Sequence, residues 1–262
     1  VSANGRPVRS NEDLTAAIQA AGGAPLTVVY RRSGARHTAT LTPTADENGH
    51  YKAGVWVRDS GAGIGTMSFV DPHRGTFAGL GHSISDADTG ADLTLLSGEI
   101  VPVTITGCIR GAAGSPGELR GEFAAAPAGT VLANDAAGVY GSYTGSCTAP
   151  ALPVANLQEV TPGEAELWTT VLGTTAQPYT IQVERVTMTG SDPNRNLLIR
   201  VTDKRLLDAT GGVVQGMSGS PIVQNGRLAA VLTHVLVNDP SRGYAIFATT
   251  MLEKADTVAS SK

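Results

Sequence analysis

The sequence has only two cysteines, Cys108 and Cys147, among 262 residues. Two thiols cannot by themselves form a structural zinc site, which takes four ligands. They could close one loop of about 40 residues, which stabilises a protein by roughly 4 kcal/mol in the chain-entropy model. Two unpaired, buried thiols are an equally good interpretation, so the cysteine count leaves the redox compartment open.

An excess of basic charge is also lacking. Lys and Arg number 19 against 23 Asp and Glu, which gives a net charge of -4 and a pI of about 5.7. Proteins that bind nucleic acid normally carry a basic patch or stripe that contacts phosphates. We therefore expect protein or peptide partners and no nucleic acid.

No stretch approaches the run of about 18 apolar residues that predicts a transmembrane helix. The first residues, Val1-Ser2-Ala3-Asn4-Gly5, include no initiating Met and do not show the basic-then-apolar order of a secretory signal. We therefore expect a trimmed or mature form that associates with a membrane only through a segment absent from this chain.

Glycine and proline are abundant, with 32 and 14 residues, whereas aromatic residues make up only 5%. This composition argues against a helix bundle. From residue 54 onward, short apolar or alternating runs are separated by turn residues, which favours a β-barrel or sandwich. The predicted strands are Gly54–Val57, Gly65–Val70, Glu99–Thr106, Leu167–Leu172, Thr180–Val186, Leu197–Val201, Pro221–Gln224, Leu228–Leu236 and Tyr244–Phe247. Helices are expected at Lys204–Thr210 and around Thr249–Val258.

The first 45 residues predict a small mixed unit. Ser10 and Asp13 have the spacing of a helix cap, so a helix should follow and end at Gly22-Gly23. Two strands around the turn at 31–36 should come next. This order resembles the second half of a PDZ domain without the Gly-rich loop that holds a peptide carboxylate. We therefore predict a truncated PDZ-like unit at 1–45, a linker at 46–53 and a peptidase domain at 54–262.

The segment with the clearest chemical signature is Gln215-Gly216-Met217-Ser218-Gly219-Ser220-Pro221. Glycines near Ser218 leave its hydroxyl open to approach, and the N–H groups of Gly216 and Ser218 could bind a developing oxyanion. Such a loop suits acyl transfer. A Gly-Ser turn before a strand is the alternative interpretation.

The following Asn225-Gly226 pair predicts a tight β-hairpin. Pairing Gln224 with Arg227 and counting back places Ser218 opposite Thr233, with His234 next to it. Chymotrypsin-like proteases have a similar arrangement, in which the strand opposite the nucleophile supports the triad and pairs with substrate. Thr233 and His234 are therefore candidates for substrate binding or support of the triad.

A serine nucleophile needs a general base, for which histidine is suited by its pKa. The chain has five histidines: His37, His50, His73, His82 and His234. His37 and His50 precede the peptidase domain, and His73 resembles a turn residue. His82, in a Gly-bracketed segment, and His234 remain as competing candidates for the base.

Four separate blocks in the same order resemble the SpoIVB peptidase family of spore-forming bacteria. They are Gly54-Val55-Trp56-Val57-Arg58-Asp59-Ser60-x-Ala62-Gly63-Ile64-Gly65-Thr66, Leu80-Gly81-His82-x-Ile84-x-Asp86-x-Asp88-Thr89, Asp203 to Ile222, and Thr233-His234-Val235-x-Val237-Asn238-Asp239-Pro240. The resemblance implies Ser218 as nucleophile, His82 as base and Asp203 as acid. An N-cap of the helix at Lys204–Thr210 is the alternative role for Asp203.

The same resemblance implies a mainly β, chymotrypsin-like double β-barrel serine endopeptidase that needs no cofactor and no metal. Its expected substrates are itself and a membrane-tethered regulator of pro-sigma-K processing during sporulation. That places it outside the cytoplasm, secreted from the forespore into the intermembrane space. Met217 stands where trypsin-like enzymes have the aspartate that binds a new amino terminus, so activation must differ.

Two other functional classes stay open from the sequence. A PDZ-plus-β module could bind the same partners without catalysis, although Ser218 and His82 are both present. A metal hydrolase using His73, His82 and His234 lacks the tight ligand spacing that such sites normally show.

Overall fold

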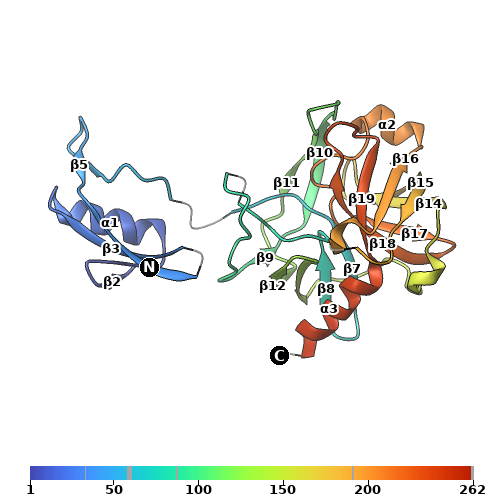
Figure 1. Cartoon of the computed structure of the whole chain (residues 1–262), viewed down its shortest axis with the longest axis horizontal. Coiled ribbons are helices and arrows are strands. Elements are labelled where there is room, and N and C mark those ends of the chain that lie inside the picture. Colours follow the sequence, from blue (N-terminus) through green and yellow to red (C-terminus); the bar gives the residue numbers. More distant parts are fainter. Residues whose placement is uncertain (33, 58–60, 87, 191, 261–262) are drawn as a thin grey trace. The chain divides into compact units, whose positions relative to one another are not determined.

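The computed structural model describes residues 1–32, 34–57, 61–86, 88–190 and 192–260, and the chain divides into two compact units (Figure 1). The first unit is Val1–Ala62 and the second is Gly63–Lys262. Arg58, Asp59 and Ser60, part of the first family-like block, lie outside the described residues.

The described residues of the first unit form a four-stranded antiparallel sheet and one helix. The sheet has the order β2-β1-β3-β4, and α1 begins because the Ser10 hydroxyl accepts a hydrogen bond from the N–H of Asp13. The helix ends at Gly22 in the left-handed conformation, as predicted. The elements are β1 (Ser2–Ala3), β2 (Arg6–Pro7), α1 (Asn11–Ala21), β3 (Leu26–Arg32) and β4 (Ala35–Leu41).

The residues predicted to form a linker fold back onto this unit. A short hairpin pairs β5 (Thr44–Ala45) with β6 (Tyr51–Lys52). The side-chain amide of Gln19 donates to the carbonyl of Tyr51 and accepts from its N–H. The boundary between the units therefore falls after Ala62 and not at 46–53.

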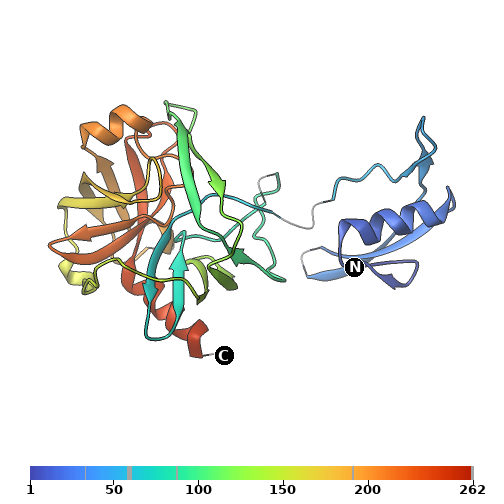
Figure 2. The ribbon, with the colours of Figure 1, turned by 180° about the vertical axis from the view of Figure 1, so that it is seen from behind.

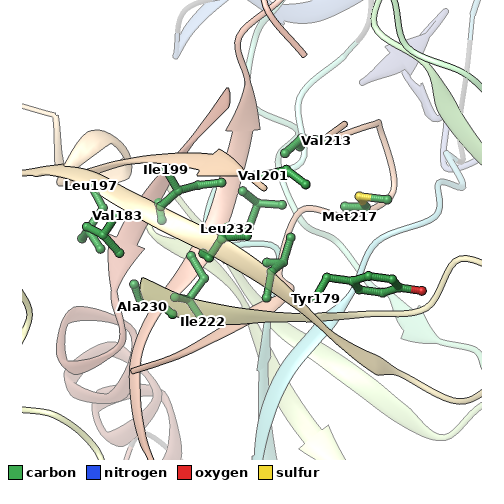
Figure 3. Close-up of a cluster of buried hydrophobic side chains, with 14 of the residues drawn as sticks. Tyr179, Val183, Leu197, Ile199, Val201, Val213, Met217, Ile222, Ala230 and Leu232 are labelled. Carbon is green, nitrogen blue, oxygen red and sulfur yellow. The ribbon is translucent and has the colours of Figure 1, made fainter. Parts of the chain in front are cut away.

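The second unit is mainly β, as predicted, and its C-terminal half is a closed six-stranded barrel with the order β14-β15-β16-β19-β18-β17. Its core cluster consists mostly of aliphatic side chains from the strands, together with Tyr179 and with Met217 from the loop before β17, as Figure 3 shows. The strands are β14 (Gly163–Thr169), β15 (Gln177–Val186), β16 (Leu197–Val201), β17 (Pro221–Gln224), β18 (Arg227–Val235) and β19 (Arg242–Phe247).

The N-terminal half of the second unit is a half-barrel, a five-stranded sheet that stays open beside the closed barrel of the predicted mainly β, double-barrel fold. Its strand order is β7-β8-β13-β12-β9, and β10 and β11 form a separate ribbon. The ribbon bonds to loops of the closed barrel instead, through Ile105 with Gly173 and Glu118 with Gln215. The strands are β7 (Met67–Asp71), β8 (Thr76–Gly79), β9 (Glu99–Ile100), β10 (Val103–Ile109), β11 (Glu118–Phe123), β12 (Gly129–Asp135) and β13 (Gly138–Tyr143).

Among the described residues, two α-helices and two short 3-10 helices complete the second unit. The helix α3 packs against β8 and β13 of the open sheet and against β18 of the barrel, so it joins the two halves (Figures 1 and 2). The bounds are η1 (Leu157–Glu159), η2 (Pro193–Arg195), α2 (Lys204–Thr210) and α3 (Ala248–Ser260). In the described part of the chain, no helix is long and apolar enough to cross a membrane.

The structure also decides the state of the two cysteines and the predicted strand at Gly54–Val57. Cys108 and Cys147 are both free thiols, and burial raises the pKa of the Cys108 thiol. The predicted strand Gly54–Val57 is wrong, because these residues form an exposed irregular segment in which Trp56 is fully exposed.

Candidate active site

The loop that carries Ser218 lies between α2 and β17 and is held from three directions. The N–H of Thr66 donates to the carbonyl of Ser218 at 2.8 Å, and the Thr66 hydroxyl donates to the carbonyl of Gly216 at 3.1 Å. The N–H of Gly219 donates to the carbonyl of Leu232 at 2.8 Å. The start of the loop is anchored to the β10–β11 ribbon, because Gln215 exchanges two backbone hydrogen bonds with Gly117 and Leu119.

Two positions of this loop require glycine. Gly219 has a φ of +97°, and a Cβ atom there would lie 1.9 Å from the carbonyl oxygen of Thr66. Gly216 has a φ of +95°, and its Cβ would lie 3.1 Å from Cβ of Leu119. Residues with side chains rarely adopt such angles. The glycines around Ser218 are therefore needed for the path of the loop as well as for access to the hydroxyl.

The loop leaves two backbone N–H groups without a partner. Among the described residues, the N–H groups of Gly216 and Ser218 donate no hydrogen bond, whereas those of Met217 and Gly219 are paired with Val214 and Leu232. Two N–H groups that have no other partner and lie close to a serine hydroxyl are the usual donors to an oxyanion. The pair named from the sequence is thus free to take this role.

The hairpin after the loop forms as predicted, with one irregularity. Asn225 and Gly226 both have positive φ, at 52° and 72°, which suits the tight turn. A shift between Ile222 and Val223 moves the register by one residue relative to our prediction. The hydroxyl of Ser218 nevertheless reaches the expected neighbour, because it donates to the carbonyl oxygen of Thr233 at 2.6 Å.

The two competing histidines lie together at this position. The ring centroids of His82 and His234 are 4.9 Å apart, with the planes tilted by 35°. His234 directly follows Thr233, and a Cβ on Gly81 would lie 2.9 Å from Cγ2 of Thr233. Ser218, His82 and His234 therefore gather around Thr233, which is fully buried.

The imidazole of His82 is fixed in the tautomer that a general base needs. Its Nδ1 lies 2.7 Å from the carbonyl oxygen of Ser83. Because a carbonyl can only accept, Nδ1 carries the proton and Nε2 is left as the acceptor. The Ser83 hydroxyl donates to Asp92, and this bond together with one from Ser85 holds the pKa of Asp92 below its ordinary value.

The segment after His82 is clamped by a residue that the sequence did not suggest. The side-chain oxygen of Asn134 accepts from the N–H of Ile84 at 2.7 Å, and its Nδ2 donates to the carbonyls of Ile84 and Leu93. Thr66 was likewise missed as a support of the serine loop, although it stands in the first family-like block. No sequence signal identified Asn134, since its partners are backbone groups 50 and 41 residues away in the sequence.

Asp203 is not brought to either histidine. Within the described residues its carboxylate accepts from Arg205 and from the N–H of Thr180, and it caps α2, which is the alternative role stated above. The Arg205 side chain is the main reason that the pKa of Asp203 falls to about 2. Leu198 of β16 and His234 of β18 both pair with Tyr244 of β19. Asp203 lies five residues after Leu198, beyond the end of β16 at Val201, where it begins α2.

Replacing Asp203 is therefore expected to affect stability more than catalysis. Asp203→Ala should lower the free energy of unfolding by about 1 kcal/mol, because it removes the cap of α2. Asp203→Asn keeps a capping oxygen, so we expect a smaller loss of stability and turnover equal to that of the unchanged protein. Urea unfolding and peptidase assays measure the two effects. A large loss of turnover in a folded Asp203→Asn protein would restore the aspartate as the acid.

His234 is an exposed residue, but partial loss of hydration around its imidazole, with contributions from His82 and the nearby Arg195 guanidinium, lowers its pKa to about 4. Between this value and about 6.5, the unfolded chain protonates the imidazole and the folded chain does not. Lowering the pH through this window should therefore destabilise the fold. His234→Asn is expected to flatten the dependence of unfolding free energy on pH between 6.5 and 4. Equal slopes in both proteins would contradict the prediction.

The other histidines lie outside this cluster. His37 stacks on Tyr30 in the first unit, and His73 is an exposed turn residue. In the described part of the chain no three His, Cys, Asp or Glu side chains are grouped to hold a metal ion. His73, His82 and His234 therefore do not form the site that the metal-hydrolase alternative requires.

Comparison with known proteins identifies the class. Residues 49–252 match the profile of the SpoIVB peptidase S55 family. No curated protein gives a significant match. Similar solved structures include the inactive form of the Rv3671c protease, at 16% identity and a TM-score of 0.36, covering 55% of this chain and 72% of that chain. The active form from M. tuberculosis has 17% identity and a TM-score of 0.36, covering 60% and 80%.

A further similar structure is the HtrA-type protease AlgW with a decapeptide, at 13% identity and a TM-score of 0.39, covering 75% of this chain and 62% of that chain. The protein is a serine peptidase with a mainly β fold. The match spans well over half of the sequence, and the chain belongs to the SpoIVB peptidase S55 family.

Proposed function

We propose that this peptidase cleaves peptide bonds through an acyl-enzyme at Ser218, with His82 as general base. The observation that carries the proposal is the cluster around Thr233. It combines the Ser218 hydroxyl, an imidazole pair at 4.9 Å and two unpaired loop N–H groups, those of Gly216 and Ser218.

In the first step, Oγ of Ser218 attacks the carbonyl carbon of the scissile bond and its proton passes to Nε2 of His82. The N–H groups of Gly216 and Ser218 bind the oxyanion that forms. The protonated His82 then gives its proton to the leaving amine. A water molecule, deprotonated by His82, releases the acyl group and restores the serine hydroxyl.

The hydroxyl must first leave the carbonyl of Thr233, to which it donates in the structure. A rotation about the Cα–Cβ bond of Ser218 supplies this movement. The vacated carbonyl can accept a main-chain N–H of an extended substrate, which is the substrate-binding role proposed for Thr233. His234, which stays neutral at pH 7, supports the imidazolium of His82 without adding a second positive charge.

The decisive experiment is labelling of the intact chain with a fluorophosphonate probe, followed by peptide mapping of the adduct. We expect covalent labelling on Ser218 and no effect of EDTA. Labelling at another residue would place the nucleophile there. No labelling together with no cleavage of a protein substrate would favour a module that only binds partners. Turnover abolished by EDTA would favour a metal hydrolase.

For its substrates, we propose a membrane-tethered regulatory protein of pro-sigma-K processing and a second copy of the chain itself, outside the cytoplasm between forespore and mother cell. Support comes from membership of the SpoIVB family and from the segment Gly54–Val57, which is irregular and exposed and could therefore enter the active site of a protease. Self-cleavage is tested by adding active enzyme to a Ser218→Ala chain and sequencing the new amino termini. An intact Ser218→Ala chain after prolonged incubation would contradict cleavage in trans.

A further inference from the structure

The peptide group between Ser83 and Ile84 lies between the imidazole of His82 and the side chain of Asn134. Its carbonyl oxygen is 2.7 Å from Nδ1 of His82, and its N–H donates to Oδ1 of Asn134 at 2.7 Å. A trans peptide group is planar, and its C=O and N–H point in opposite directions. The two hydrogen bonds therefore form one chain through a rigid group, from the amide of Asn134 to the ring of His82.

The amide of Asn134 fits its surroundings in one orientation. Its Nδ2 donates to the carbonyls of Ile84 and Leu93 at 3.0 and 2.9 Å, while its Oδ1 accepts from the N–H of Ile84. Because a carbonyl only accepts and an N–H only donates, a flipped amide would lose all three bonds. Oδ1 is thus fixed toward the peptide group that contacts His82.

The open sheet places Asn134 within reach of the segment after His82. Gly79, at the end of β8, pairs with Val139 of β13, and Val139 pairs with Asn134 of β12. Between Gly79 and His82 the chain turns at Leu80, which has a φ of +68°. A branched side chain rarely adopts such an angle, and it persists only where the surrounding structure holds it. The three bonds of Asn134 hold the chain directly after this turn.

A peptide carbonyl meets Nδ1 of His82 where the usual triad has a carboxylate. In that triad the carboxylate sets the tautomer and orientation of the imidazole and stabilises the imidazolium. Asp203, the acid expected from the sequence, is bonded to Arg205 instead. A neutral carbonyl is a weaker acceptor than a carboxylate, but hydrogen bonds in a chain polarise one another. The bond from the N–H of Ile84 to Asn134 therefore strengthens the carbonyl that faces His82.

We propose that Asn134 is a positioning residue for the base His82 and acts through the Ser83–Ile84 peptide. It holds the carbonyl that accepts from Nδ1, so Nε2 stays free to take the proton of Ser218. It also makes that carbonyl a better acceptor when the imidazole becomes positive. This inference deepens the proposed function and rests on it.

Two replacements of Asn134 separate its acceptor from its donor. Asn134→Asp keeps an oxygen for the N–H of Ile84 and loses the donor to the carbonyls of Ile84 and Leu93. Asn134→Leu has a similar size and loses both. A side chain that only fastens the loop would give equal losses in the two variants, because both lack Nδ2.

Ser85→Ala provides a matched control in the same segment. The Ser85 hydroxyl donates to the carboxylate of Asp92 at 2.9 Å, so its loss loosens the segment after His82. The change leaves the Ser83–Ile84 peptide and the side chain of Asn134 in place. Loss of a hydrogen bond in this segment can therefore be compared with loss of the bond that leads to the imidazole.

The experiment compares the three variants in the whole chain. We measure the maximal rate and half-saturation of fluorophosphonate labelling, the melting temperature, and the 15N shifts of the His82 imidazole. Asn134→Leu should lower the maximal rate roughly ten- to a hundredfold with half-saturation nearly unchanged, and should raise the share of the tautomer protonated at Nε2. Asn134→Asp should lower the melting temperature but keep the tautomer and a rate well above that of Asn134→Leu. Ser85→Ala should change only the melting temperature.

Unchanged labelling and unchanged His82 shifts in a folded Asn134→Leu protein would overturn the inference while leaving the proposed function in place. Equal losses of rate in the two Asn134 variants, or in Asn134→Leu and Ser85→Ala, would overturn it as well, because the effect would then come from a loosened segment. If Asn134→Leu does not fold, Asn134→Asp decides, and a changed His82 tautomer in that variant overturns the inference. If the unchanged protein is neither labelled nor active, the proposed function fails and the inference fails with it.

Discussion

Replacing Ser218 with alanine is expected to abolish fluorophosphonate labelling and to lower peptidase turnover by about 10⁴-fold or more. The change removes the only atom that forms the acyl-enzyme, whereas the loop is held by backbone groups of Ser218, Gly216 and Gly219 that alanine does not disturb. The melting temperature should therefore stay close to that of the unchanged protein. Activity assays and thermal unfolding measure the two effects on the same samples.

Ser220 supplies the control for this experiment. It lies two residues later, is fully buried, and its hydroxyl has no hydrogen-bond partner within the described structure. Ser220→Ala should therefore keep labelling and turnover near those of the unchanged protein. Comparable labelling of the Ser218→Ala and unchanged proteins would place the nucleophile elsewhere and remove the basis of the assignment.

Replacing His82 with alanine is expected to lower both labelling and turnover by about 10³-fold or more, because the Ser218 hydroxyl then has no base to take its proton. Of the two ring nitrogens of His82, Nε2 is the one left to accept the proton, since Nδ1 is bonded to the carbonyl of Ser83. The remaining imidazole of His234 has a pKa of about 4, which makes it a weak base. It should not restore the lost rate.

The exposed turn residue His73 provides the comparison, and His73→Ala should retain full labelling. Two outcomes would contradict the role of His82. In one, His82→Ala keeps its rate. In the other, His234→Ala loses far more rate than His82→Ala, which would exchange the roles of the two histidines. Melting temperatures of all variants separate loss of base from loss of fold.

Features that depend on neighbouring residues could be predicted from the sequence. The cap at Ser10, the helix at Lys204–Thr210 and the tight turn at Asn225-Gly226 each follow from a few adjacent residues, and each is confirmed. The strands Leu197–Val201 and Pro221–Gln224 have the predicted bounds. Short-range preferences and turn chemistry are enough for such elements.

Strands rich in glycine or charge were missed. Gly138–Tyr143 contains two glycines, and in Glu118–Phe123 three charged residues alternate with Leu119, Gly121 and Phe123, so neither has the run of β-branched and aromatic residues by which the other strands were predicted. They form because neighbouring strands supply hydrogen bonds, as β8 and β12 do for β13. The openness of the first sheet could not be predicted either, because the ribbon β10–β11 bonds to barrel loops instead.

The chemistry of the site divides in the same way. The sequence by itself determined the serine loop, its two glycines, the neighbouring strand and the pair of candidate histidines, because each depends on a local motif. Only the tertiary structure placed His82 beside His234, brought the N–H of Thr180 to the Asp203 carboxylate, and put Asn134 at the site. These contacts join residues tens of positions apart, and hydrogen-bond partners at such separations are decided by the packing of the two halves, which no local pattern encodes.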